Sequence, residues 1–313
     1  MKKQIDVSIV IPVLNGEATL EKCLTSIRAN RTAYNYELIV VDAGSTDRSL
    51  EIATWYADKA LTGEPHTIDR NAGIAIAAGK IICFTDSDCI VPPDWIEKLA
   101  SGLMELHVKD PRIVGVGGGN VPEIENGSAT EMAIIRAMRS PFISFKARNT
   151  AVYGNSREVS HNPPLNSACY KSVLDEMGGF VQQPGYPEDL DIDARILAHG
   201  YKLYYLPEVN VVHKHRSSLK AFASQMRDFG EKRCRVNRKH KQISHLYHYG
   251  PMMLCMMLYS PLFFVPLGLA LINASFISTR ERTFKLFLIV TQLTIEFYRN
   301  YGIGEMKAVL ESE

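Results

Sequence analysis

The amino-terminal part of the chain repeats one pattern, in which a short apolar run is followed by a polar turn and an amphipathic segment. The first run spans Val7–Ile11 and is closed by Pro12, and a polar turn through Asn15 and Gly16 follows it. A near-continuous apolar run of this length predicts a strand that is buried on both faces. The segment after the turn has helical periodicity, with these apolar residues on one face: Leu20, Leu24 and Ile27.

The same pattern follows immediately. A second strand is predicted over Glu37–Val41, with Asp42 at its tip. Ser45 or Thr46 is positioned to cap a helix that begins near Asp47, because short hydroxyl side chains accept the free amides of a first helical turn.

A third predicted helix, over residues 70–79, leads into the apolar segment Ile81–Val91, which contains Asp86 and Asp88. Alternating strands and helices predict an α/β domain with a mainly parallel sheet whose loops gather at one edge. Ligands bind at that edge, and two carboxylates there can face one hard divalent cation, Mg²⁺ or Mn²⁺. Asp-x-Asp is also common in surface turns, so a turn without metal is the alternative.

Two phosphate-binding motifs are absent from the sequence. No Gly-x-Gly-x-x-Gly follows the first strand, so a dinucleotide cofactor is not expected. No Gly-x-x-x-x-Gly-Lys-Ser/Thr is present, so the chain is not a P-loop enzyme. The predicted domain is therefore Rossmann-like, with a different ligand.

Four ordered segments together resemble the motifs of family 2 glycosyltransferases, which are inverting enzymes of the GT-A fold. They are residues 7–27, 40–49, 70–79 and 85–89, and the resemblance extends to about Arg216. It implies a metal-dependent enzyme that binds a nucleotide-sugar on a Rossmann-like, mainly parallel sheet flanked by helices. Four motifs in order are far more specific than any one of them.

The resemblance also implies roles for individual residues. The end of the first strand near Pro12 and the loop at Asp42 would hold the base and ribose, and Arg70 would lie near the diphosphate. Asp86 and Asp88 would form the metal-binding Asp-x-Asp motif. The residues implied for donor binding are Pro12, Asn15, Glu17, Asp42, Arg70, Asp86 and Ser87.

Ala43 is a departure from the family pattern. Many members carry a second acid at this place, directly after the first, where it contacts the edge of the base. The sequence therefore leaves the donor open between a UDP-sugar and a GDP-sugar.

The second half of the chain supplies acids at the start of another predicted helix. Glu188 and Asp189 directly follow Pro187, which places both in the first turn. Acids there complement the helix dipole, so a purely structural role is one interpretation. The resemblance implies the other, with Asp189 as the general base and Glu188 as a neighbour that orients the acceptor or the base.

The same helix carries three further charged residues, Asp191, Asp193 and Arg195. By helical spacing, Asp189 and Asp193 share a face while Asp191 points elsewhere. Arg195 lies four residues after Asp191, and an ion pair between the two would make both structural.

His213 ends the apolar run of a predicted strand that begins near Val209. A histidine at a strand end is commonly solvated or hydrogen-bonded without binding metal. The resemblance implies a metal ligand at this place, and a parallel strand would bring His213 to the same sheet edge as the two aspartates. His215 is the weaker candidate because it lies past that edge.

Composition agrees with a globular enzyme. The chain has 313 residues, of which 46% are hydrophobic, and its net charge of +1 gives no indication of a nucleic-acid partner; we expect none. The six cysteines have no paired spacing, which favours reduced, buried thiols over disulfides or a zinc site. The amino terminus does not have the pattern of a signal peptide.

The carboxyl-terminal part has a different composition. Residues 220–241 contain eight Lys or Arg against two acids, and residues 251–279 contain no charged residue. The uncharged stretch is long enough for a transmembrane helix, but Pro261 and Pro266 interrupt it. A second apolar stretch spans Phe284–Ile295, so a kinked or interfacial helix pair competes evenly with two spans. The basic run would meet anionic lipid on the cytoplasmic face.

These patterns predict a division into regions. The catalytic GT-A domain would span 1–219, with a nucleotide-sugar-binding half at 1–110 and an acceptor half at 111–219. A basic interfacial helical region would follow at 220–250, and hydrophobic membrane-associated helices at 251–313. The expected location is the cell membrane, with the catalytic domain in the cytoplasm.

The leading hypothesis is a membrane-associated, metal-dependent inverting glycosyltransferase that transfers sugar to a glycan or lipid-linked acceptor by single displacement. Processive synthesis is disfavoured because Gln225–Phe229 lacks the Gln-x-x-Arg-Trp motif of polymerising members. A nucleotidyltransferase is one alternative, although the loop after the first strand lacks the expected Gly-rich, basic phosphate site. A non-catalytic membrane scaffold that binds nucleotide-sugar is the other.

Overall fold

Side chains of the first strand, β1 (Val7–Val13), alternate between two hydrophobic cores on opposite faces of a sheet. Ile9 and Ile11 lie in one core, whereas Val10 lies in the other, as the period of two along a strand requires. The helices that cover the two faces are α1 (Glu17–Arg28), α2 (Ser49–Tyr56) and α4 (Trp95–Lys109) on the first, and α3 (Arg70–Ile76), α7 (Lys171–Glu176) and α8 (Glu188–Ala198) on the second. Burial on both faces explains the continuous apolar run in the sequence.

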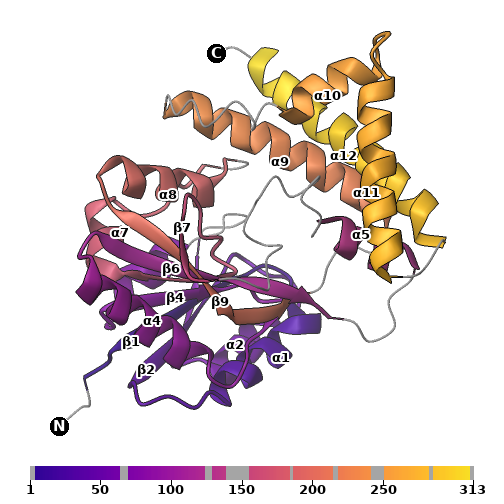
Figure 1. Ribbon diagram of the computed structural model, residues 1–313. Coiled ribbons are helices and arrows are strands. Elements are labelled where there is room, and N and C mark those ends of the chain that lie inside the picture. The colour runs from indigo at the N-terminus through magenta and orange to yellow at the C-terminus, as the bar shows by residue number, and fades with distance from the viewer. Residues whose placement is uncertain are drawn as a thin grey trace. The chain divides into compact units, whose positions relative to one another are not determined.

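This computed structural model describes residues 4–63, 70–123, 129–138, 155–183, 186–213, 218–240, 250–281 and 285–310. The chain divides into two units, coloured along the sequence in Figure 1. The sheet unit comprises Met1–Val121 and Ala151–Lys214, and the helical unit comprises Pro122–Thr150 and His215–Glu313. Within 122–150, which the sequence groups with the acceptor half, the described helix at 129–138 therefore belongs with the carboxyl-terminal helices.

The central sheet is mixed rather than mainly parallel. Its strand order within the described residues is β3-β2-β1-β4-β8-β6-β9-β5, and β7 pairs with β9. β3, β2, β1 and β4 run parallel, whereas β8 is antiparallel to both β4 and β6, and β9 is antiparallel to β5 and β7. The strands besides β1 are β2 (Tyr36–Asp42), β3 (Lys59–Thr62), β4 (Ile81–Thr85), β5 (Cys89–Ile90), β6 (Ile113–Pro122), β7 (Arg157–Val159), β8 (Asn166–Tyr170) and β9 (Lys202–His213).

The prediction of a mainly parallel sheet holds for the first half and fails for the second, for a topological reason. Parallel neighbours need a crossover connection, and the repeated strand–helix pattern of the amino-terminal part provides it. β4 and β8 are neighbours in space but are separated in the chain by α4, β6 and the segment 122–150. No single crossover joins them, so their direction is free to be antiparallel.

Two local predictions also change. Pro12 does not close the first strand, because β1 continues to Val13, which pairs with Asp42 of β2. At the start of α2, Asp47 rather than Ser45 or Thr46 accepts the free amide, with the backbone N–H of Ser49 donating to Asp47 Oδ1 at 3.0 Å. The predicted face of α1 is confirmed, with these residues fully buried: Leu20, Leu24 and Ile27.

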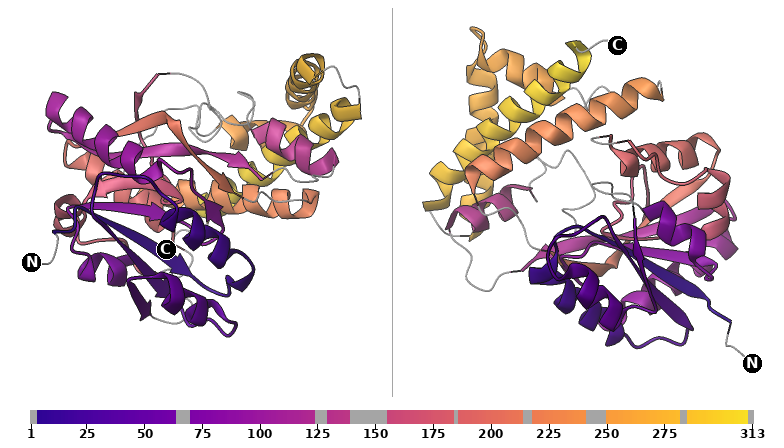
Figure 2. Two further views of the ribbon diagram at one scale, coloured as in Figure 1. Left: turned by 90° about the horizontal axis from the view of Figure 1, so that it is seen from below. Right: turned by 180° about the vertical axis from the view of Figure 1, so that it is seen from behind.

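The helical unit packs around its last helix. α12 (Lys285–Leu310) contacts each of the other helices of the unit, and Figure 2 shows α9 alongside it. Those helices are α5 (Ala129–Met138), α9 (Leu219–Lys239), α10 (Gly250–Leu258) and α11 (Phe264–Glu281). A Cβ added at Gly230 of α9 would lie 2.1 Å from the carbonyl oxygen of Tyr301, so the lack of a side chain at Gly230 lets the backbones of α9 and α12 approach closely.

The described helices of this unit do not meet the requirements of a membrane crossing: none of them is both long enough and apolar enough. The unit has its own apolar core, built from α5, α9, α11 and α12 around Phe222, Phe297 and Tyr298. The prediction of reduced, buried cysteines is confirmed, since all six are free and buried.

Candidate active site

The first two loops at the carboxyl edge of the sheet are held together by side chains for which the family resemblance implies donor binding. Asn15, in the left-handed conformation at φ 50°, accepts a hydrogen bond from the backbone N–H of Thr46 at 2.9 Å. Glu17 accepts the N–H of Arg48 at 3.2 Å. Asp42 is 2% exposed and accepts the N–H of Ser45 at 3.0 Å. Pro12 is buried within β1.

Arg70, at the start of α3, links two acidic segments that are far apart in the chain. Its Nη2 lies 3.0 Å from Asp86 Oδ1, and its Nη1 forms an ion pair with Glu188 Oε1. The guanidinium also lies 5.8 Å from the centroid of the Phe180 ring. Arg70 is 5% exposed, and its buried Nε has no hydrogen-bond partner among the described residues.

The Asp-x-Asp motif follows β4, and its two carboxylates have different neighbours. Asp86 contacts Arg70, whereas Asp88 Oδ2 lies 3.3 Å from His213 Nε2. His213 reaches this place because the end of β9 pairs with Cys89 of β5. The structure thus brings His213 to the motif, although through an antiparallel pairing and not through the parallel strand that the prediction assumed. Ser87, between the two aspartates, lies against Gly16: a Cβ added at that glycine would be 3.4 Å from Ser87 Oγ.

Asp88 and His213 fit a divalent cation. Two neighbouring ligand atoms of an octahedral cation with bonds of about 2.1 Å lie about 3 Å apart. Asp88 Oδ2 and His213 Nε2 are 3.3 Å apart, which is close to that separation. Cys89 Sγ lies within the same group of atoms, but burial raises the pKa of the Cys89 thiol, which therefore stays protonated. A carboxylate and an imidazole suit Mn²⁺ or Mg²⁺ better than a thiol does.

Glu188 and Asp189 open α8 after Pro187, as predicted, and differ in exposure. The Asp189 side chain is 36% exposed, and its Oδ1 accepts the backbone N–H of Leu190 at 2.9 Å. The Glu188 side chain is 16% exposed. The pKa of Glu188 is raised to about 7, chiefly by burial, with Arg70 opposing the rise and the nearby Asp189 and Asp86 contributing to it.

His161 is a site residue that the sequence analysis misses. Its Nε2 lies 3.6 Å from Asp189 Oδ2, and its Nδ1 lies 2.7 Å from Asp193 Oδ2. The predicted shared face of Asp189 and Asp193 is therefore occupied by an imidazole from another segment. A pair of acids on one helix face, without a cation on that face, is the pattern that could have indicated such a partner.

The predicted structural pair Asp191–Arg195 is confirmed. Arg195 Nε donates to Asp191 Oδ2 at 2.7 Å, and Asp191 is fully buried. Arg195 also donates from Nη2 to the carbonyl oxygen of Gly179 at 2.8 Å. Phe180, the next residue, exchanges two hydrogen bonds with the Asn71 side chain of α3. Arg195 thus attaches α8 to the loop before it, and Asn71 attaches that loop to α3.

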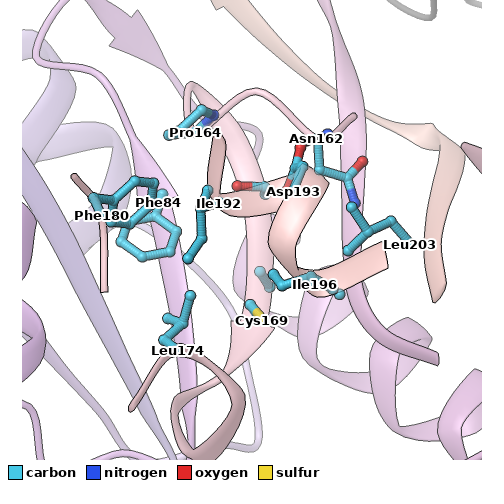
Figure 3. Close-up of a pocket in the computed structure, with 13 residues that line it drawn as sticks. Phe84, Asn162, Pro164, Cys169, Leu174, Phe180, Ile192, Asp193, Ile196 and Leu203 are labelled. Atoms are coloured by element: carbon cyan, nitrogen blue, oxygen red, sulfur yellow. Dashed lines mark hydrogen bonds between the residues drawn. The ribbon is translucent and has the colours of Figure 1, made fainter. Parts of the chain in front are cut away.

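A small pocket lies between α8 and the sheet, behind the acids (Figure 3). Asp193 and Asn162 form its polar end, and apolar side chains line the rest, including Phe84, Cys169, Phe180, Ile192 and Ile196. The ring of Phe84 packs edge-on against that of Phe180, with centroids 5.5 Å apart. The apolar side chains of this lining pack between α8 and the sheet.

Comparison with known proteins gives the site its context. Residues 8–148 match the model of glycosyl transferase family 2. The pre-mycofactocin glycosyltransferase of Mycobacterium tuberculosis is 29% identical over 231 residues, which cover 72% of this chain and 46% of that protein. The chain thus spans about half the length of that curated relative.

One relative and one solved structure match over nearly the whole chain. A dolichyl N-acetyl-alpha-D-glucosaminyl phosphate 3-beta-D-2,3-diacetamido-2,3-dideoxy-beta-D-glucuronosyltransferase of Methanococcus voltae is 24% identical, with 97% of each chain covered. The mannosyltransferase PcManGT of Pyrobaculum calidifontis, solved with GDP-Man and Mn²⁺, has a TM-score of 0.61 and 17% identity, with 100% of this chain and 89% of that chain covered. The latter likeness shows a GT-A-like α/β fold. The chain is therefore similar to glycosyltransferases, and its residues 8–148 match the family 2 model.

Proposed function

We propose that the protein transfers a sugar from a nucleoside diphosphate donor, a UDP-sugar or a GDP-sugar, to a hydroxyl of a lipid-linked acceptor, with inversion and in a single displacement. The observation that carries the proposal is the gathering of Asp86, Asp88 and His213 with Arg70, Glu188 and Asp189 in one unit. A single displacement needs a neutralised leaving group on one side and one carboxylate base on the other.

The donor side combines a cation site with a buried arginine. A divalent cation held by Asp88 and His213 would neutralise the charge that develops on the departing diphosphate. Arg70 is the buried cation of this region, and its Nε supports a further interaction because it lacks a partner among the described residues. We assign Arg70 to the diphosphate and Asp42 to the ribose.

The acceptor side depends on Asp189. Its exposed carboxylate is available to an incoming hydroxyl, whereas Glu188 is largely buried against Arg70. Asp189 therefore accepts the proton as the hydroxyl attacks, and Glu188 fixes Arg70. Both act without a covalent intermediate, because inversion in one step requires none.

A lipid-linked acceptor and attachment to a membrane complete the proposal. The name of the Methanococcus voltae relative specifies a dolichyl phosphate-linked substrate, which supports an acceptor of this class. The helical unit carries a row of exposed apolar residues in and between α10 and α11: Met253, Met256, Tyr259, Leu262, Phe263, Phe264 and Ile272. We name this surface the apolar tip.

The apolar tip suits the interfacial region of a bilayer rather than a crossing. No charged residue occurs between Pro251 and Thr279, and α9 adds basic residues that anionic lipid attracts. Phe263 and Phe264 are 54% and 58% exposed, which is costly in water and favourable among lipid headgroups. The proposed location is the cytoplasmic face of the cell membrane.

The test of the donor site compares two substitutions of the same kind. Asp88→Ala should lower the rate of transfer by at least about 100-fold. It should also abolish the Mn²⁺-dependent thermal stabilisation that the donor gives in a panel of UDP- and GDP-sugars. Asp94→Ala is the matched control, because Asp94 is exposed and pairs with Lys98 on α4. Undiminished turnover in excess chelator would contradict the metal dependence, and a product with retained anomeric configuration would contradict the single displacement.

A further inference from the structure

The loop before β8 places a histidine between two acids of α8. We propose that His161 is a positioning residue for Asp189: anchored by the buried carboxylate of Asp193, it fixes the Asp189 carboxylate in the orientation in which it accepts the acceptor's proton. The inference rests on the proposed function, because it takes Asp189 as the base.

Asp193 holds the imidazole in one orientation. It is 5% exposed, and its Oδ2 is shared by His161 Nδ1 at 2.7 Å and the backbone N–H of Asn162 at 2.5 Å. A carboxylate can only accept, so Nδ1 carries the hydrogen of this bond. Nε2 attracts the Asp189 carboxylate only when it is protonated as well, so the positioning form of His161 is the imidazolium between two acids. The ring is thereby fixed with Nε2 towards Asp189, in the arrangement by which a second carboxylate commonly orients a functional histidine.

The two oxygens of Asp189 then have different tasks. Oδ1 is held by the N–H of Leu190 within the first turn of α8, whereas Oδ2 lies 3.6 Å from His161 Nε2. That separation is within reach of an ion pair and longer than a hydrogen bond. Catalytic contacts are often long in a protein without substrate and shorten when substrate binds. Since Asp189 remains partly exposed, an acceptor hydroxyl can approach the carboxylate while His161 keeps it from rotating.

A purely structural role is the competing explanation. In that role His161 only attaches its loop to α8 through Asp193, and the Asp193 contact alone would matter. The two nitrogens of the ring separate the explanations, because one faces Asp193 and the other faces Asp189.

The experiment exchanges one nitrogen at a time. In His161→Asn the amide nitrogen replaces Nδ1 and keeps the Asp193 contact, whereas in His161→Gln the longer amide reaches the position of Nε2 near Asp189. We expect kcat to fall about 10- to 100-fold in His161→Asn with donor KM unchanged, and His161→Gln to retain more of kcat. A kcat of His161→Asn that equals or exceeds that of His161→Gln would overturn the proposal and favour the structural role.

A double variant provides the second readout. If His161 acts through Asp189, His161→Asn should have no further effect on kcat in an Asp189→Asn background, because the group that it positions is gone. Multiplicative losses would overturn the proposal. The effect of His161→Asn on kcat in the two backgrounds can be compared even where the single variants lose stability, because each kcat is normalised to the amount of folded protein measured by circular dichroism.

Controls separate this inference from the proposed function. His107→Gln changes another partly buried histidine of the sheet unit, whose Nδ1 contacts the carbonyl oxygen of Ile113, and should leave kcat unchanged. If Asp189→Asn keeps full turnover, the proposed base itself is wrong. If Asp189→Asn loses turnover while both His161 variants keep it, only the positioning role is wrong.

Discussion

The sheet unit and the helical unit bury ionisable groups in opposite ways. In the sheet unit the buried cation Arg70 lies between two carboxylates, Asp86 and Glu188. In the helical unit Glu305 of α12 is 2% exposed and receives the backbone N–H of Met252, and its Oε2 has no hydrogen-bond partner among the described residues. Burial raises the pKa of Glu305 to about 8, with Arg233 opposing the shift.

The difference indicates what each unit is built for. At the edge of the sheet Arg70 opposes the effect of burial on its two acids, although the pKa of Glu188 is still raised to about 7, and the ion pairs are formed at the cost of desolvation. A carboxyl that is neutral at physiological pH adds no charge to a helical core, and the surface of the same unit carries the apolar tip. We infer that the sheet unit performs the chemistry and the helical unit performs attachment.

The strongest test of this separation is Asp189→Asn, which preserves size but cannot accept the proton. We expect kcat to fall by about 10²–10⁴ with little change in donor affinity or in vesicle binding. Asp175→Asn is the matched control, because Asp175 is 54% exposed and pairs with Lys171 on the surface of the same unit. If Asp189→Asn instead loses donor binding and keeps its turnover number, Glu188 becomes the better candidate base.

The reciprocal test removes apolar area from the helical unit. The double substitution Phe263→Ser and Phe264→Ser should weaken binding to phosphatidylglycerol vesicles about tenfold or more, because two exposed rings no longer enter the interface. Donor-dependent hydrolysis in solution should not change. Trp55→Ser is the control, since Trp55 is 81% exposed on α2 of the sheet unit. Equal loss of vesicle binding in both variants, or no loss in either, would contradict the assignment of attachment to the apolar tip.

A third test concerns stability. The folded protein holds the Glu305 proton up to about pH 8, whereas the unfolded chain releases it near the ordinary value of 4.5, so folding becomes less favourable as pH rises through that window. Glu305→Gln should remove this dependence, which amounts to at most about 1.4 kcal/mol for each pH unit. Urea unfolding across the window measures it. An unchanged pH dependence in the variant would mean that Glu305 is ionised in the folded protein.

The sequence predicts those parts of the site that local pattern determines. Asp86 and Asp88 follow an apolar strand, Glu188 and Asp189 follow a proline, and the i,i+4 spacing of Asp191 and Arg195 gives their ion pair. Each of these depends on only a few neighbouring residues. The resemblance to family 2 glycosyltransferases, and no local pattern, grouped His213 with the aspartates.

Contacts between distant segments could not be predicted in this way. Arg70 meets Glu188 across 118 positions in the chain, and His161 meets Asp193 across 32, because strand order in the sheet brings their segments together. The direction of β8 and the grouping of α5 with the carboxyl-terminal helices depend on the same long-range arrangement. Neither leaves a periodic signal in the residues concerned.

The burial of every cysteine has a practical consequence for studying the two units. Burial raises the pKa of all six thiols, so reagents that need a thiolate react with the native protein slowly. Cys23, Cys83, Cys89 and Cys169 belong to the sheet unit, and Cys234 and Cys255 belong to the helical unit. Alkylation followed by peptide mass spectrometry therefore records when each unit opens, without a label or a mutation, and reveals whether the two open as one cooperative body or in turn.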